Sequence, residues 1–265
     1  TSDLARFSVI IFLASYIDNN YKKMKSFFTG ILVPLTAILP VALMIVIQPD
    51  NSTTMILLAI VYAMLFIGGA SFIQLLTIGT ISVGAFTIAI LNKGNYALAR
   101  ILSFINPASS ENVSYQSSQA LIGLKQGGIS GMGIGESIQK YSYLPETHTD
   151  FIFAIIGEEM GFITGIILMI AYYIIFYRSI QISKKSNDTF GILLSIGFGL
   201  SISIYALINI GVVIGIVPVT GVPLPFISYG GSSLITNLMM IAILLNISKA
   251  QRKINVRKWR LRVDA

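Results

Sequence analysis

The sequence contains no cysteine, a single histidine and few charged residues. Charged side chains make up 11% of the 265 residues, whereas soluble domains carry about 25%. The lack of cysteine excludes disulfides and thiolate metal sites, but it says little about the compartment. Because His148 is the only histidine, no second His or Cys can complete a zinc site. A soluble globular protein and a zinc enzyme are therefore both disfavoured.

Apolar residues are correspondingly abundant, at 54% of the chain, and the mean hydropathy is +0.79. A membrane helix needs roughly 20 mostly apolar residues, and seven segments approach this length. Proline at positions 34 and 40 is expected to kink the second segment, and Gly68-Gly69-Ala70 predicts a tight turn. The sequence thus predicts an all-α integral membrane protein, one polytopic domain over residues 1–265. The predicted membrane helices are residues 4–17, 28–47, 53–69, 71–91, 151–177, 190–216 and 231–247.

The 18 Lys and Arg residues are unevenly distributed, and 13 of them lie in three short segments. Short basic segments beside apolar runs follow the positive-inside rule rather than the pattern of nucleic-acid binding. We therefore expect no nucleic-acid partner and a cytoplasmic C-terminus, with the basic tail 248–265 on anionic lipid. The segments placed inside are 18–27, 178–189 and 248–265; those placed outside are 48–52, 92–150 and 217–230.

The largest segment outside the predicted helices is 92–150, an external loop with a glycine-rich centre. Loops of this length without regular structure are usually functional or disordered. Its isolated apolar residues suggest that it folds back onto the membrane surface. The GMGIG string at 131–135 lacks the βαβ context of a dinucleotide fingerprint. We expect its glycines to allow tight turns instead.

The stretch LPETHTDF places Glu146, His148 and Asp150 beside the start of a membrane helix. A carboxylate there can cap the helix, facing free N–H groups and the positive end of the dipole. The clustering favours a site, in which an ionised Asp150 could act as general base towards a sugar or water hydroxyl. A hard cation held by carboxylates and substrate phosphates is a second reading that the sequence leaves open.

Further carboxylates lie within apolar segments, where they need a wet cavity, the bundle interior or a cationic partner. Glu158 and Glu159 lie about 12 Å below Asp150 at 1.5 Å per residue. Adjacent positions point about 100° apart, so we expect one to be structural, capping a neighbouring helix, and the other to line a cavity. Asp3 and Arg6 are spaced for an intrahelical ion pair, and Arg6 is a candidate anion contact.

The segment PVTGVPLPFISYGGSS, within 217–233, is too rich in proline and glycine for a continuous helix. Irregular backbone at membrane depth survives only where protein or water covers it. Either a re-entrant hairpin that plugs the bundle or a cavity wall satisfies this condition. The hydroxyls of Ser228, Tyr229, Ser232 and Ser233 favour the cavity wall.

These segments together resemble the SEDS family of peptidoglycan polymerases, which includes FtsW, RodA and SpoVE. The resemblance runs nearly end to end, and the tail and the PVTG segment are slightly more similar to FtsW-type than to RodA-type members. It implies a bundle of ten membrane helices, of which the seven here correspond to the last seven, as if the chain were truncated at its N-terminus. The matching stretches are TSDLARFSVIIFLASYI, IQPDNSTTMILL, RILSFINP, YQSSQALIGLKQGGISGMGIG, LPETHTDFIFAIIGEE and PVTGVPLPFISYGGSSL.

The resemblance implies polymerisation of lipid II, an undecaprenyl-diphosphate-linked disaccharide-pentapeptide, on the outer face of the bacterial cytoplasmic membrane during division or elongation. The essential external Asp of the family aligns with Asp150. Arg6 and Asp3 stand where the family has a cavity Lys and Glu, so the charges are kept and the geometry is changed. Further expected substrate contacts are Glu146, His148, Thr149, Gln116, Gln119, Lys125, Glu158, Ser228, Tyr229 and Ser232.

The implied partners are a class B penicillin-binding protein, which would supply transpeptidase activity, and other membrane proteins of division or elongation. No organic cofactor is expected, and Mg²⁺ or Mn²⁺ stays open. Two other functions fit a polar membrane bundle: a flippase for the lipid-linked precursor and a non-catalytic scaffold. A flippase has no need of a base on an external loop, and a scaffold should tolerate Asp150→Asn.

Overall fold

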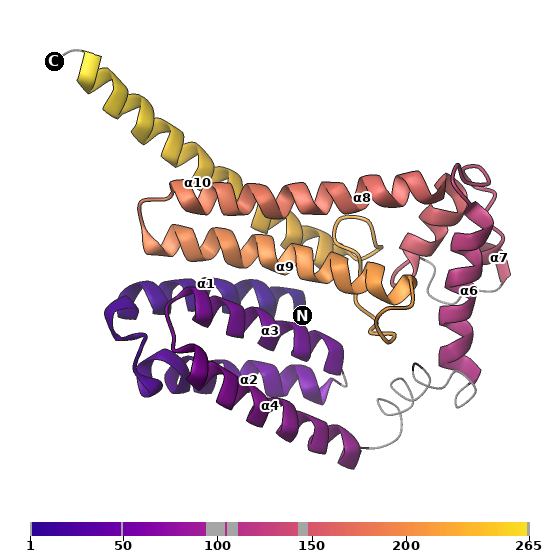
Figure 1. Cartoon of the computed structure of the whole chain (residues 1–265), viewed down its shortest axis with the longest axis horizontal. Coiled ribbons are helices and arrows are strands. Elements are labelled where there is room, and N and C mark those ends of the chain that lie inside the picture. The colour runs from indigo at the N-terminus through magenta and orange to yellow at the C-terminus, as the bar shows by residue number, and fades with distance from the viewer. Residues whose placement is uncertain (1, 49, 94–103, 105–110, 143–147, 264–265) are drawn as a thin grey trace.

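A computed structural model describes residues 2–48, 50–93, 104, 111–142 and 148–263. All regular elements in these ranges are helical. The seven predicted helices are all present, and Figure 1 shows them packed roughly side by side along one axis. They are α1 (Ser2–Asn20), α2 (Val33–Ile47, preceded by the π-turn Phe28–Leu32), α3 (Asn51–Ile67), α4 (Phe72–Lys93), α8 (Ile152–Lys185), α9 (Thr189–Val213) and α10 (Gly231–Val263).

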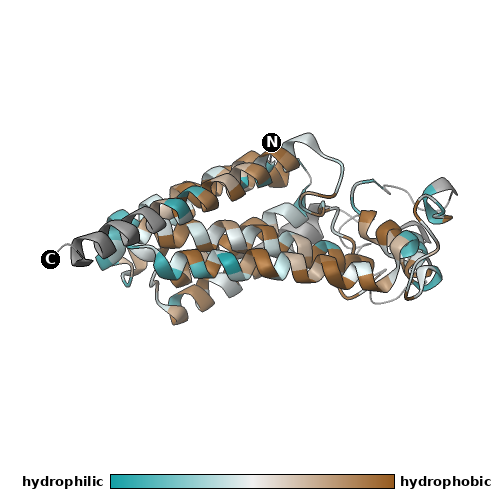
Figure 2. Ribbon diagram, turned by 90° about the horizontal axis from the view of Figure 1, so that it is seen from above, coloured by the Kyte–Doolittle hydropathy of each residue, from teal (hydrophilic) through white to brown (hydrophobic). Residues whose placement is uncertain are grey.

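Four of these helical segments are long and apolar enough to cross a membrane, judged by length and composition over the described residues. They are Phe28–Ile47, Ile152–Lys185, Thr189–Val213 and Gly231–Ala250. Helix α3 and the first part of α4 are shorter apolar helices, and α1 is a more polar one of 19 residues. Apolar residues follow most of the length of the bundled helices (Figure 2), as expected of a multi-pass membrane protein.

Helix α9 forms the centre of the bundle and is buried over most of its length. It packs against α1, α3, α8 and α10. Phe198 stacks on Phe7 of α1, with ring centroids 5.4 Å apart. Small residues allow the close approach, since a Cβ on Gly197 would lie 2.8 Å from Ile10 of α1. A helix that is apolar on all faces is normally buried, so the composition of α9 explains its position.

Several boundaries differ from the sequence predictions. Helix α8 continues to Lys185 and α1 begins at Ser2, because amphipathic ends extend a helix beyond its apolar core. Helix α10 continues without a break to Val263, through the segment predicted as a basic tail, and projects beyond the bundle (Figure 1). The turn at Gly68-Gly69-Ala70 is confirmed, with Gly69 at φ 92°.

The segment 92–150 is more ordered than a long loop would be. Its described part contains α6 (Glu111–Gly127) and the single turn α7 (Gln139–Ser142). Helix α6 lies across one end of the bundle, at a steep angle to the other helices (Figure 1), and packs on α8 and α9. The close approach needs glycine, because a Cβ on Gly127 would lie 2.1 Å from the carbonyl oxygen of Gly157 in α8.

Helix α8 is interrupted at Gly161, whose φ of 79° and ψ of 178° are not helical. The glycine-rich loop that follows α6 docks into this interruption. Its backbone forms hydrogen bonds with groups that the broken helix leaves without helical partners. The bonds run from Phe162 N to Gly128 O (2.9 Å), from Met132 N to Glu158 O (3.0 Å) and from Gly133 N to Glu159 O (3.0 Å).

We predict that Gly131→Ala destabilises the protein because the new Cβ would lie 2.2 Å from the carbonyl oxygen of Glu159. Gly135→Ala is the matched control: Gly131 and Gly135 have φ of 83° and 90°, but no described atom lies within 4 Å of a Cβ at 135. Left-handed backbone alone costs about 1–2 kcal/mol. Thermal unfolding in detergent should therefore show a larger loss for Gly131→Ala, and equal losses would contradict this docking.

Candidate active site

Asp150 lies in the turn that precedes α8. The N-cap position is Phe151, and no side chain there accepts a hydrogen bond from the first turn. The sequence left a simple N-cap carboxylate as the alternative to a site residue, and Asp150 lies one residue before the N-cap position. The half-buried Asp150 side chain instead faces Gly221, where an added Cβ would lie 3.5 Å from Oδ2. Gly221 has φ of 72°, so this wall of the site suits glycine in both space and conformation.

The backbone of this turn is held by three consecutive carbonyl groups. Each accepts a hydrogen bond from α9 or from the irregular segment 217–230. Because three successive peptide groups are fixed in this way, the direction in which the Asp150 side chain leaves the backbone is fixed as well. The donors are Tyr229 N to His148 O (2.8 Å), Ser228 Oγ to Thr149 O, and Asn209 Nδ2 to Asp150 O (2.8 Å).

The segment 217–230 is irregular, as its prolines predict. Val219, Val222 and Leu224 are buried, and its polar groups find partners inside the protein. The Leu224 N–H donates to Ser228 Oγ at 2.7 Å, and the hydroxyl of Tyr172 in α8 donates to the carbonyl of Pro225. The segment is thus a covered piece of non-helical backbone that holds the Asp150 turn.

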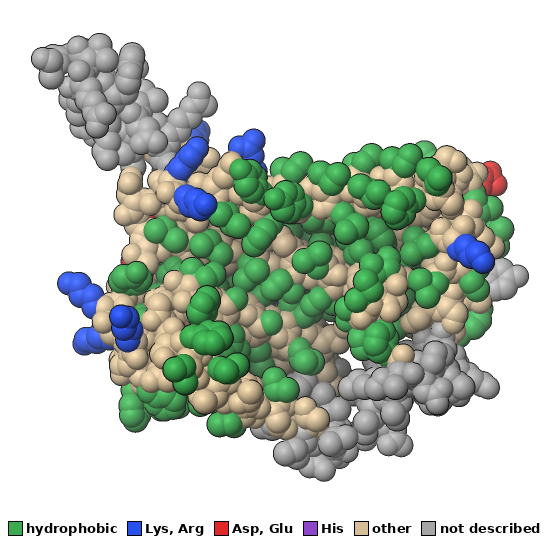
Figure 3. Space-filling view, in the orientation of Figure 1, with side chains coloured by type: hydrophobic (Ala, Val, Ile, Leu, Met, Phe, Trp, Pro, Cys, Tyr) green, Lys and Arg blue, Asp and Glu red, His purple; other side chains and the backbone are tan. Residues whose placement is uncertain are grey.

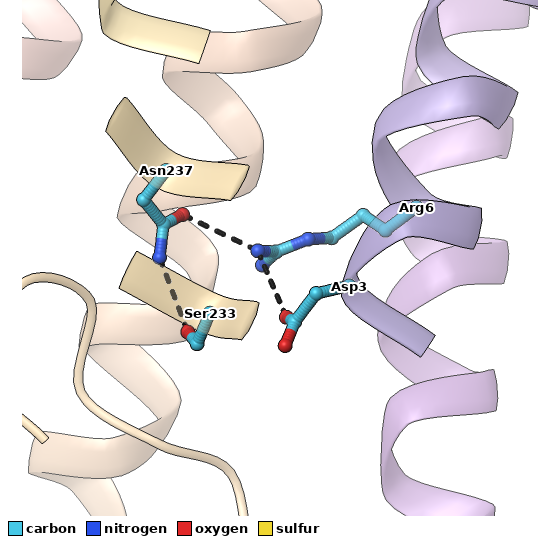
Figure 4. Close-up of polar contacts among 4 residues, drawn as sticks. All are labelled: Asp3, Arg6, Ser233 and Asn237. Carbon is cyan, nitrogen blue, oxygen red and sulfur yellow. Dashed lines mark hydrogen bonds and ion pairs between the residues drawn. The ribbon is translucent and has the colours of Figure 1, made fainter. Parts of the chain in front are cut away.

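A second polar cluster lies where α1 meets α10. The intrahelical ion pair is confirmed: Arg6 Nη2 lies 3.2 Å from Asp3 Oδ1. The same nitrogen donates to Asn237 Oδ1 at 3.2 Å, and Asn237 Nδ2 donates to Ser233 at 3.3 Å. Figure 4 shows the Arg6 side chain extending from α1 to α10. The guanidinium also lies 3.8 Å from the ring centroid of Tyr205 in α9, within the range of a cation–π contact.

Arg6 is completely buried, although it was expected to contact an anion in a cavity. Its Nε and Nη1 have no hydrogen-bond partner among the residues that the structure describes. The same is true of the hydroxyls of Tyr205 and Thr236. Buried donors without partners are unfavourable, so the cluster has unused capacity to bind an acceptor.

The two carboxylates in α8 have different surroundings. Glu158 is fully buried and accepts hydrogen bonds from Ser137 Oγ, Ile138 N and Gln139 N at the start of α7. The expected capping of a neighbouring helix is therefore confirmed for this residue. Glu159 is half-buried, and its Oε1 has no partner among the described residues.

The other predicted contacts are spread around this end of the bundle. Gln116, Gln119 and Lys125 lie on α6, and Lys125 is exposed. Tyr229 is 82% exposed, so its ring is accessible although its backbone N–H is used. His148 and Ser232 are also exposed, whereas Thr149 is half-buried. Glu146 lies outside the described residues.

Sequence reasoning missed three residues of these clusters: Tyr205, Asn209 and Asn237. Tyr205 and Asn209 are four residues apart on α9, so they share one face of the helix. The first contacts Arg6 and the second holds Asp150. An Asn within a nearly continuous apolar run was the signal available, because a buried amide in such a helix needs a specific partner.

The profile of the FtsW/RodA/SpoVE family of cell cycle proteins matches residues 1–253 of the chain. The chain belongs to this family.

Among curated members of the FtsW/RodA/SpoVE family, the chain is 38% identical over 252 residues to stage V sporulation protein E of Bacillus subtilis, covering 95% of this chain and 69% of that protein. It is 39% identical over 250 residues to a probable peptidoglycan glycosyltransferase FtsW of Halothiobacillus neapolitanus, covering 93% and 60%. The chain therefore spans 69% of the length of the first of these relatives and 60% of the second.

Two solved structures of similar fold bear on the architecture. One comes from a study of how a peptidoglycan synthase complex coordinates polymerisation and crosslinking; it has a TM-score of 0.69, 25% identity and coverage of 94% of this chain and 70% of that one. The other is a mutant of the rod shape determining protein RodA of Thermus thermophilus, with a TM-score of 0.62, 22% identity and coverage of 94% and 66%. The second similarity supports the fold alone.

We predict that Ser228→Ala destabilises the protein more than Ser203→Ala. The Ser228 hydroxyl bridges the Leu224 N–H and the Thr149 carbonyl, and a buried group left without its partner costs about 1–3 kcal/mol. The Ser203 hydroxyl only contacts the Gly199 carbonyl of its own helix at 2.8 Å. Chemical unfolding in detergent measures both losses, and equal stability of the two variants would argue against the bridge.

Proposed function

We propose that this chain acts as a peptidoglycan glycosyltransferase that polymerises lipid II at the outer face of the cytoplasmic membrane. The observation that carries the proposal is the fixed turn at Asp150, whose three consecutive carbonyls are bonded to α9 and the segment 217–230. A general base must keep its carboxylate within hydrogen-bond reach of the hydroxyl it deprotonates. Membership of the family and the names of its glycosyltransferase relatives support the same reaction.

In the proposed reaction, Asp150 takes the proton of the attacking sugar hydroxyl. The resulting oxygen nucleophile forms a bond to the anomeric carbon of a second lipid-linked sugar. The bond from that carbon to the diphosphate breaks, and undecaprenyl diphosphate leaves with the electron pair. The apolar helix faces would contact the lipid tail, and a cation would offset the charge on the diphosphate.

The distribution of charge supports an external position for Asp150. Lysine and arginine gather at one end of the bundle (Figure 3), where α1 ends before Lys22 and α8 ends at Lys185. Asp150 precedes α8 and so lies at the opposite end. The positive-inside rule then places the basic end in the cytoplasm and the segment 92–150 outside.

Two further components complete the proposal. A class B penicillin-binding protein would cross-link the strands, and the similarity to a chain of a peptidoglycan synthase complex favours such a partner. Other division or elongation membrane proteins would join this assembly. If the reaction uses Mg²⁺ or Mn²⁺, Asp150 and the substrate would hold the ion, which would offset negative charge on the leaving diphosphate. The described residues contain no group of three or more His, Cys, Asp or Glu that could hold a metal ion.

A flippase or a scaffold would use the same bundle differently. Flipping needs polar groups along a path through the membrane, and the Arg6 cluster would serve it. Neither function requires a carboxylate whose backbone is fixed at three positions. A polymerase therefore explains why the backbone of the Asp150 turn is fixed, whereas a flippase or a scaffold does not.

We predict that Asp150→Asn folds and inserts normally but loses polymerisation, because the amide cannot accept the hydroxyl proton. Gel-resolved glycan products from labelled lipid II measure the effect in the full-length protein with its transpeptidase partner. A loss of 100-fold or more, on the order of what one acid–base group contributes, is expected. Asp188→Asn is a control, since Asp188 caps α9 at the basic end. Wild-type polymer from Asp150→Asn would remove the general base from the mechanism.

We predict that Arg6→Ala weakens binding of lipid II more than it slows turnover of bound substrate. The guanidinium has two nitrogens without partners among the described residues, and a diphosphate would supply acceptors for both. Because Arg6 is buried, the diphosphate would reach it only if α1 and α10 separate.

The measurement is the KM for lipid II, with Arg178→Ala as control, because Arg178 is a surface residue near the basic end of α8 that bonds Gln181. A several-fold rise in KM confined to Arg6→Ala is expected. An unchanged KM in a folded Arg6→Ala protein would leave the cluster a purely structural contact between α1 and α10.

A further inference from the structure

We propose that Asn209 is a positioning residue for the Asp150 base. The inference rests on the proposed function in one respect, namely that Asp150 takes part in the reaction. Asn209 lies in the apolar helix α9 and is 1% exposed. Its amide bonds two segments that are far apart in the sequence and that form opposite sides of the site.

Both donors of the Asn209 amide are used. Nδ2 donates to the carbonyl of Asp150 at 2.8 Å and to the carbonyl of Val222 at 2.7 Å. A primary amide has two N–H groups on one nitrogen, so it can bridge two carbonyls at a fixed separation. A serine or threonine hydroxyl has only one donor and could not do so.

The two carbonyls belong to the two parts of the site whose separation matters. Asp150 carries the carboxylate, and Val222 follows Gly221, the residue that lies beside Oδ2. A shift of either carbonyl away from Nδ2 would change the distance between the carboxylate and this wall. One side chain thus sets the space in which an acceptor hydroxyl can approach Asp150.

The cost of the arrangement supports a specific role. The Oδ1 atom of Asn209 is buried and has no hydrogen-bond partner among the described residues, which is unfavourable in the interior of a membrane bundle. Packing alone would be served better by leucine, which is larger but has the same branched arrangement of heavy atoms and no polar atoms. Leucine would leave both carbonyls without this donor, and only the bonds from Ser228 and Tyr229 would still join the turn to the segment 217–230.

Catalysis depends steeply on such placement, because a displacement of about 1 Å can cost about 100-fold in rate. The expected phenotype of Asn209→Leu is a kcat about 10- to 100-fold lower, with KM within about twofold of wild type. Substrate-binding groups away from Asp150 are unchanged in this variant, so affinity is kept. A purely structural role would lower the amount of folded protein without this division between kcat and KM.

The test compares wild type, Asn209→Leu and Ser201→Ala in the full-length protein with its transpeptidase partner. Ser201 is a matched control because it is a buried polar residue of α9 whose hydroxyl has no partner among the described residues. Two quantities are measured: polymerisation kinetics with labelled lipid II, and deuterium uptake by backbone amides in peptides spanning residues 148–152. A shorter variant, Asn209→Ser, replaces Asn209→Leu if the latter does not fold.

The expected result is a lower kcat together with faster deuterium uptake confined to residues 148–152, in the Asn209 variant and not in Ser201→Ala. Unchanged kcat, or uptake that rises equally throughout the bundle, would overturn the proposal. If wild type makes no polymer, the proposed function fails, and the uptake at 148–152 still decides whether Asn209 fixes this turn. Local uptake unchanged from wild type would then reject the positioning role by itself.

Discussion

The site depends on the rule that peptide groups inside a membrane protein must find hydrogen-bond partners within the protein. Helices satisfy this rule by themselves, but the Asp150 turn and the segment 217–230 do not. The carbonyls of residues 148 and 149 accept hydrogen bonds from Tyr229 and Ser228, and Asn209 of α9 donates to a carbonyl of each piece. Neither piece of backbone would be stable inside the protein without the other, so main-chain bonding of this turn helps to place the carboxylate.

The same rule governs the interrupted helix α8. Gly161 breaks the helical ladder, and the loop after α6 replaces the missing bonds with its own peptide groups. Glycines at 127, 131 and 161 allow the two backbones to approach closely. The buried carboxylate of Glu158 adds a second connection, to the start of α7. The described part of the segment 92–150 is therefore part of the folded bundle and not an appendage to it.

The sequence predicted the helices well, because apolar run length and flanking charges are direct consequences of a membrane environment. It also predicted the Asp3–Arg6 pair and the capping role of one α8 carboxylate, which follow from helical spacing and the cost of buried charge. The docking of the loop into α8 was not predictable, since backbone-to-backbone pairing leaves no side-chain pattern. The role of Asn209 was missed for a related reason: its partners are carbonyls, which every residue has.

The break at Gly161 has a mechanical consequence. A continuous helix moves as one rigid rod. Helix α8 instead consists of two helical parts joined at Gly161, and the loop that follows α6 is hydrogen-bonded across this joint. The loop after α6 bonds residues on both sides of this joint, so the part of α8 beside Asp150 is held by this loop and α6 as well as by the rest of its own helix. The turn that carries Asp150 is therefore connected to α6 as well as to α9 and the segment 217–230.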